Sequence, residues 1–191
     1  MGILPPHLVA RMSRFEVYKC FLNRDWREKG MAQVLVVRAV PEDKYIAGLF
    51  LVDVFCLGVK NTFVTAPMNT DELEDFRGRF PEKLHEISYE DARSLILGGI
   101  QYAQGLGFKP HPDWKSAQCI VEGGRPFEGK FEYGKDGKPF YVQGPDDDVD
   151  RIMRQLGPLI ERGEAEYVCG VSQEEWEDGD EDLVWVEDDR S

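Results

Sequence analysis

KYIAGLFLVDVFCL (Lys44–Leu57) follows AQVLVVRAV (Ala32–Val40) after the short polar turn PED (Pro41–Asp43). Both long runs are rich in β-branched, aliphatic and aromatic residues, so the pattern predicts an antiparallel β-hairpin. The second run is apolar at both sets of alternating positions. We therefore expect it to be a central strand that is covered on both faces.

Asp53 is the acidic exception inside this second run. An ionised carboxylate among apolar residues is costly unless it is paired or hydrogen-bonded. Its pKa is expected to be raised by burial or lowered by a cation such as Lys60. Perturbed carboxylates concentrate at functional sites, but they also form structural bonds to backbone amides in loops, and both interpretations stay open.

Elements on either side of the hairpin follow from local patterns. Residues 15–22 (FEVYKCFL) favour a strand, and residues 23–30 (NRDWREKG) favour one or two helical turns or a structured loop. A short helix is expected after Thr70, where acidic residues suit the helix dipole.

The clearest helix begins after Ser88, with Asp91 three residues on as in a capping box. It closes at Gly105 or Gly107. Gly98 and Gly99 each cost a helix about 1 kcal/mol relative to Ala, which predicts close packing against another element. The positions with helical spacing are Ala92, Leu95, Ile96, Gly99, Ile100 and Ala103.

A second hairpin is predicted around the tight turn Asp136-Gly137, between KFEY (130–133) and KPFYV (138–142). The acidic run Asp146–Asp148 suits the start of an amphipathic helix that extends to about residue 161, with a kink or early stop at Pro158. A last strand is expected over 165–171.

These elements predict an α+β fold. Its sheet is antiparallel or mixed and is built from the hairpins 32–57 and 130–142. The helices near 89–104 and 147–161 pack on that sheet.

The chain divides into a single α+β domain over 1–171 and an acidic tail over 172–191. The tail has ten acidic residues and one basic residue, a net charge of −9 out of −13 for the chain. Such a composition is typical of a flexible segment that binds partners. Within it, Leu183–Val186 (LVWV) is an apolar island that we expect either to dock on a sheet edge or to serve as a short linear motif.

Length and charge argue against several classes of protein. The 191 residues are 42% apolar, enough for a folded core. The net charge of −13 disfavours a broad surface for nucleic-acid phosphates, which needs clustered Lys and Arg. No stretch approaches the about 20 apolar residues that cross a bilayer, and no secretory signal is evident.

Cysteine usage also favours a cytoplasmic setting. The four cysteines form no C-x-x-C pair and no zinc-type cluster, and buried thiols are the simplest interpretation. They are Cys20, Cys56, Cys119 and Cys169. The glycine pairs match neither the dinucleotide fingerprint nor the P-loop, so no cofactor is expected.

Candidate catalytic residues are Asp53, Cys56, His111 and Asp113. His111 and Asp113 lie in KPHPD, a loop fixed by prolines, and a His/Asp pair suits a base or a metal ligand. Cys56 could act as a nucleophile with His111 as its base and an aspartate as the orienting group.

Each of these residues also has a structural interpretation. Asp113 could cap the following helix while His111 bonds to a loop carbonyl. Cys56 lies between Phe55 and Leu57 with no nucleophile motif around it, so it could belong to the core. A metal site that adds Asp146–Asp148 competes with a simple helix N-terminus.

Three stretches resemble a family of uncharacterised, hypothetical bacterial proteins. They are FLVDVFCLGVKNTF (50–63), LILGGIQYAQGLGFKPHPDW (95–114) and FEYGKDGKPFYVQGP (131–145), and the resemblance extends over about residues 15–170. The resemblance implies a bacterial, cytosolic setting. It implies no activity, cofactor or catalytic residue.

The function favoured by these observations is a non-enzymatic protein-binding or regulatory module. It would meet a protein partner through the acidic tail or a sheet edge. The alternative is a hydrolase or metal-dependent enzyme centred on Asp53, Cys56, His111 and Asp113.

Overall fold

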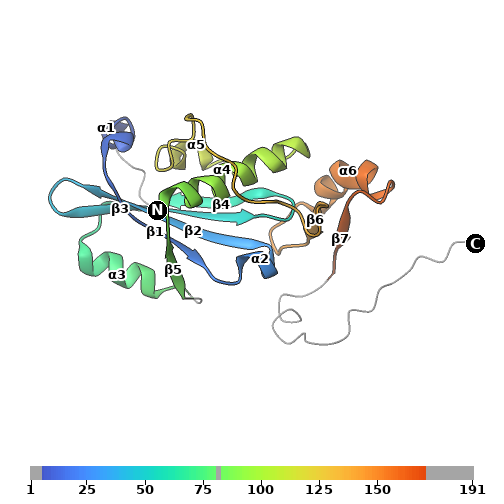
Figure 1. Ribbon diagram of the computed structural model, residues 1–191, viewed down its shortest axis with the longest axis horizontal. Helices are drawn as coiled ribbons and strands as arrows, with labels where there is room; N and C mark the ends of the chain where they lie inside the picture. The colour runs from blue at the N-terminus through green and yellow to red at the C-terminus, as the bar shows by residue number, and fades with distance from the viewer. Residues whose placement is uncertain (1–5, 81–82, 171–191) are drawn as a thin grey trace, which may run out of the picture.

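The computed structural model describes residues 6–80 and 83–170, so the acidic tail lies outside the described residues (Figure 1). Its centre is a five-stranded antiparallel sheet with the order β4-β3-β2-β1-β5. The strands are β1 (Val17–Asn23), β2 (Met31–Val40), β3 (Lys44–Asp53), β4 (Gly58–Val64) and β5 (Leu84–Ile87). The α+β class predicted from the sequence is confirmed.

Helices cover both faces of this sheet. The long helix α4 lies along one face and α3 lies on the opposite face (Figure 1). A further helix, α6, gathers at one end of the molecule with β6 (Phe140–Val142) and β7 (Glu166–Val168), which pair in parallel. The helices are α1 (Pro6–Val9), α2 (Trp26–Lys29), α3 (Thr70–Gly78), α4 (Tyr89–Gly105), α5 (Trp114–Ala117) and α6 (Val149–Ile160), with a 3₁₀ turn at Met12–Arg14.

The central strands are buried on both sides, as their composition predicts. Val34 and Val36 of β2 belong to the core under α4, whereas Leu35 and Val37 belong to the core under α3. Each of these four side chains has 0% exposure. Successive residues of a strand point to opposite faces, so a run without polar positions requires two apolar layers.

One predicted boundary in the first hairpin is wrong. The run 44–57 is not a single strand, because β3 ends at Asp53 and residues 54–57 form a turn into β4. The turn residues are themselves apolar and mostly buried. The sequence pattern therefore shows no polar break where the chain reverses.

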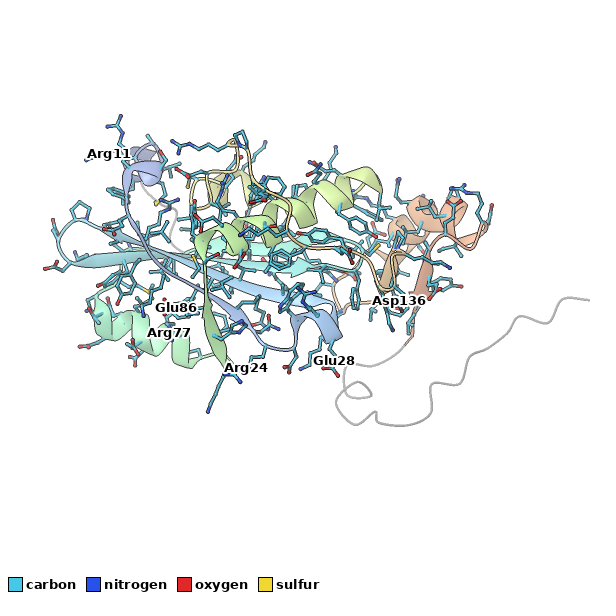
Figure 2. All side chains as sticks on the ribbon, viewed as in Figure 1. Arg11, Arg24, Glu28, Arg77, Glu86 and Asp136 are labelled. Atoms are coloured by element: carbon cyan, nitrogen blue, oxygen red, sulfur yellow. The ribbon has the colours of Figure 1, made fainter. Side chains whose placement is uncertain are left out.

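The second predicted hairpin is only partly present. Asp136 and Gly137 form the tight turn, which the single bridge Lys135↔Lys138 closes. Residues 130–133 form no strand, and β6 pairs with β7. Figure 2 labels Asp136, close to the end of the molecule that holds β7 and α6.

The glycine pair in α4 has the role that its position predicts. A Cβ on Gly98 would collide with the Tyr133 hydroxyl, and one on Gly99 would lie 2.7 Å from Cγ1 of Val52. Gly58 of β4 lies against the backbone of α4 at the same place. Because these glycines have no side chain, α4 can lie close to the sheet on one side and to residues 127–133 on the other.

A third apolar cluster joins α6 to the C-terminal end of α4. Its members are Cys56, Leu57, Ala103, Phe108, Tyr141, Ile152 and Leu156, with Leu106, Met153, Leu159 and Ile160 packed against them. Asp148 caps α6 by accepting a hydrogen bond from the Arg151 amide, and the helix continues past Pro158. None of the helices in the described part of the chain combines the length and apolar character that crossing a membrane requires.

Candidate functional site

Asp53 closes the turn between β3 and β4. Its Oδ1 accepts hydrogen bonds from the backbone amides of Phe55 and Cys56, both at 2.9 Å. The residue is 5% exposed. The carboxylate supplies the hydrogen-bond acceptor that these turn amides would otherwise lack. This is the structural interpretation that the sequence left open.

Burial controls the ionisation of Asp53 and of Cys56. It raises the pKa of Asp53 to about 6, although the Cys56 amide and the Lys60 charge lower it. Cys56 has 0% exposure, and burial together with the Asp53 charge raises the pKa of its thiol well above the ordinary value. A nucleophilic cysteine requires the opposite shift, so this environment disfavours a reactive thiolate.

We expect Asp53→Asn to change how stability depends on pH. The pKa of Asp53 is about 6 in the folded protein against 3.8 for a free carboxyl, so the folded state holds the proton more tightly. The wild-type protein therefore loses free energy of unfolding as pH rises through this interval, by about 3 kcal/mol in total. The variant has no proton to lose there and keeps an oxygen for the two amides.

Urea unfolding at pH 4 and pH 7 measures this effect. Between the two pH values, the free energy of unfolding of Asp53→Asn should rise relative to the wild type by about 2 kcal/mol. Asp53→Ala, which removes the acceptor as well, should be less stable than Asp53→Asn at both values. A difference between Asp53→Asn and the wild type that stays constant with pH would contradict the burial effect.

His111 and Asp113 form a local pair on the loop before α5. The Asp113 amide donates to Nδ1 of His111 at 3.2 Å, and Nδ1 lies 3.9 Å from Oδ2 of Asp113. The His111 amide donates to the Val59 carbonyl of edge strand β4 at 2.9 Å. Asp113 occupies the N-cap position of α5, but its side chain makes no capping hydrogen bond. The loop thus covers part of a sheet edge.

The four candidate residues are not joined into one centre. Within residues 6–80 and 83–170, no hydrogen bond or ion pair links His111 or Asp113 to Asp53 or Cys56. The same residues contain no group of three or more His, Cys, Asp or Glu side chains that could hold a metal ion. Asp53 is bonded to its own turn, and Cys56 is in the core.

Lys60 and Asp147 form the principal buried ion pair near this turn. Lys60 Nζ lies 2.8 Å from both carboxylate oxygens of Asp147, and the two side chains are 18% and 9% exposed. Asp147 also accepts from the Gly144 amide at 2.8 Å and the Tyr141 hydroxyl at 3.3 Å. This ion pair therefore joins the residues just before α6 to strand β4.

A β-bulge directs Lys60 toward its partner. Val52 pairs with Val59 and Leu51 pairs with Asn61, so Lys60 is the extra residue of β4. Bulges re-aim side chains in this way. Sequence reasoning named Lys60 only as a partner for Asp53, because Asp147 is 87 residues distant and its acidic run indicates a helix start.

A shallow groove lies beside the C-terminal half of α4 and is here called the α4 groove. Its volume is about 440 Å³, within the range of about 300–1,000 Å³ typical of ligand sites. It is lined by Gly98, Gln101, Tyr102, Gly105, Leu106, Phe127, Gly129, Phe131 and Tyr133. The lining is thus mainly aromatic and glycine, without a charged side chain.

Hydrogen bonds to α4 hold the opposite wall of the α4 groove in place. The Tyr133 hydroxyl donates to the Ser94 carbonyl at 2.7 Å, and the Lys130 amide donates to Ser94 Oγ at 2.8 Å. Arg93 donates to four backbone carbonyls of the preceding loop, those of Val121, Glu122, Arg125 and Pro126. The wall is anchored on both sides of Phe127 and Gly129.

Two features add chemistry to the α4 groove. Tyr102 stacks on Tyr133 with ring centres 5.6 Å apart, and its buried hydroxyl has no hydrogen-bond partner among the described residues. Outside the lining, the Arg27 guanidinium lies 5.6 Å from the centre of the Phe131 ring and 4.6 Å from that of the Trp26 ring. Arg27 is exposed and forms no ion pair within the described ranges. The α4 groove therefore has aromatic walls, and a cation lies next to the ring of Phe131, one of its lining residues.

Comparisons with known proteins give no significant match to this chain. No model of a protein family matches the chain, and neither the curated proteins nor the solved structures yield a significant match. The geometry of the molecule therefore carries the functional argument.

Proposed function

We propose that this protein is a non-enzymatic protein-binding module whose binding surface is the α4 groove. Its ligand is a short peptide segment of a partner protein, with a large aromatic side chain between aliphatic residues and acidic residues at its flanks. The observation that carries the proposal is a ligand-sized aromatic groove held open by glycines. The proposed binding surface is thus the α4 groove and not the sheet edge that the sequence analysis considered.

The chemistry of the α4 groove supports this choice of ligand. Phe127, Phe131 and Tyr133 offer rings against which an aromatic side chain can pack. No charged group lines the interior, whereas Arg27, next to the Phe131 ring, forms no ion pair among the described residues and can pair with an acidic flank. Apolar contacts in the centre and a charge at the rim are the usual anatomy of a peptide site.

The state of the four candidate catalytic residues also favours a binding module. The Asp53 carboxylate accepts two turn amides, and burial disfavours the Cys56 thiolate. His111 accepts the Asp113 amide through Nδ1. No single observation favours the hydrolase or metalloenzyme alternative over these structural roles.

We further propose a cytoplasmic setting. The four cysteines are free thiols, and Cys20 and Cys56 are buried. Such unpaired, buried thiols suit a reducing compartment.

A labelled peptide tests the proposed site directly. The probe has the sequence of residues 181–189 (EDLVWVEDD), which has the proposed chemistry. The receptor is the full chain with Leu183→Ser and Trp185→Ser, so that only the added peptide offers an apolar segment of this kind. We expect a dissociation constant on the order of 10–100 μM by fluorescence anisotropy, since a few apolar side chains are buried against the entropy of association.

Substitution of two glycines identifies the binding surface. Gly105→Leu fills the α4 groove and should weaken peptide binding at least about tenfold. Gly78→Leu in α3 is the matched control, because a Cβ has open space at both positions. Equal weakening by the two substitutions, or no binding of the peptide to the receptor, would overturn the proposed site.

A further inference from the structure

We infer that the chain's own segment Leu183–Val186 occupies the α4 groove when no partner is bound, so that a partner must displace it. This inference rests on the proposed function, because it assigns an internal competitor to the same groove. It makes the acidic tail a regulatory element of the module.

The tail segment has the chemistry that the α4 groove accepts. Trp185 lies between aliphatic residues, and acidic residues precede and follow the segment at Asp182 and Glu187. The aromatic side chain suits the rings of the groove, and an acidic flank suits Arg27.

The described chain ends beside β6, whose Tyr141 packs with Ala103 and Leu106 at the C-terminal end of α4. It ends just after β7, which pairs with β6, and the Phe140 amide of β6 donates to the Phe55 carbonyl beside the turn. Leu106 lines the α4 groove and also packs against the α6 cluster at this end. The two regions are therefore neighbours in the fold.

The length of the connection permits docking. Thirteen residues lead from Gly170 to Leu183, and an extended chain spans about 3.3–3.6 Å per residue, so the segment can reach about 45 Å. Helix α4 has 17 residues and a length of about 25 Å. The reach exceeds the whole length of the helix that forms the groove.

Attachment to the chain makes the segment an effective competitor. A short flexible linker gives a tethered ligand an effective concentration in the millimolar range. With an affinity on the order of 10–100 μM, the segment would fill most of the grooves and weaken binding of an added peptide about 10- to 100-fold.

The experiment compares three full-length proteins with the same labelled 181–189 peptide. The peptide should bind the Leu183→Ser/Trp185→Ser variant at least about tenfold more tightly than the wild-type chain. Trp176→Ser removes the other tryptophan of the acidic tail and is the matched control, which should behave like the wild type.

Each result has one meaning. Equal affinity for the wild type and the double variant overturns the inference and leaves the proposed function standing. No binding to any of the three proteins overturns the proposed function and the inference with it. Equal tightening by Trp176→Ser would contradict the assignment of residues 183–186.

Limited proteolysis gives a second measurement that needs no peptide. Gly105→Leu should expel the segment, so that chymotrypsin cleaves after Trp185 several times faster than in the wild type. Gly78→Leu should leave the cleavage rate unchanged. Equal cleavage rates in all three proteins would overturn the inference.

Discussion

Gly58→Ala is expected to lower the free energy of unfolding by about 2–5 kcal/mol. The residue begins β4 with φ +67°, a left-handed conformation that costs an alanine about 1–2 kcal/mol. A Cβ there would also lie 2.7 Å from the Gly99 carbonyl oxygen and 2.8 Å from the Ala103 Cβ. Because the first contact is with helix backbone, α4 must move, and overpacking of this kind costs about 1–3 kcal/mol more.

Gly137→Ala separates the two contributions. Gly137 has φ +81°, but a Cβ there meets nothing within 4 Å. Its substitution should cost only the conformational strain of about 1–2 kcal/mol. Thermal and urea unfolding of both variants give the comparison, and equal losses would show that contact with α4 does not restrict position 58.

Gly58→Ala also bears on the α4 groove. The helix that forms one wall of the groove packs on Gly58 through Gly99, and Tyr133 of the other wall packs on the adjacent Gly98. A shift of α4 therefore alters both walls. Peptide binding should weaken in the part of the Gly58→Ala population that is still folded, whereas Gly137→Ala should bind like the wild type.

Local patterns in the sequence predict the elements whose geometry is local. The hairpin over 32–53, the long helix after Ser88 and the helix after the acidic run at 146–148 all follow from periodicity and capping residues. The turn after Asp53 could not be read in this way. Its backbone amides are satisfied by one buried carboxylate, so the chain needs no polar or glycine-rich sequence until Gly58.

Tertiary contacts decide the parts that were predicted wrongly or missed. Residues 130–133 have strand-like composition, but the Lys130 amide and the Tyr133 hydroxyl bond to Ser94 of α4. The α4 groove exists because residues 130–133 bond to α4 and form no strand. Its glycines are visible in the sequence as a packing signal, whereas the segment that packs on them is about 35 residues further along.

The same reason explains the candidate site. Asp53 stands out in the sequence because its charge interrupts an apolar run, and the turn amides that it accepts are two and three residues away. Lys60 and Asp147 pair over 87 residues, so neither has a local signal for the other. Sequence alone could therefore find the buried carboxylate, but it could not find the ion pair beside it.

Arg38→Met is expected to lower the free energy of unfolding by about 3–5 kcal/mol. Arg38 lies near the C-terminal end of β2 and is 2% exposed. Its guanidinium donates to the carbonyls of Ile120 and Phe15, both at 2.7 Å, and to the Tyr89 hydroxyl at 2.6 Å. Methionine has a similar length but no donor, so the buried Ile120 carbonyl and the half-buried Phe15 carbonyl each lose a charged partner, at about 1.5–3 kcal/mol for a hydrogen bond to a charged group.

Arg77→Met is the matched control for this substitution. Arg77 also stacks on an aromatic ring, 4.1 Å from the centre of Phe21, but it lies on α3 (Figure 2), is 31% exposed and, among the described residues, forms an ion pair with Glu74 alone. Its loss should cost about 1 kcal/mol or less.

Hydrogen exchange gives a second measurement. Because the acceptors of Arg38 belong to segments 23 to 82 residues away, exchange should also accelerate near Phe15 and Ile120 in Arg38→Met alone. Equal losses of stability in the two variants, with unchanged exchange at both segments, would show that Arg38 contributes only as packed surface and does not tie these segments to the sheet.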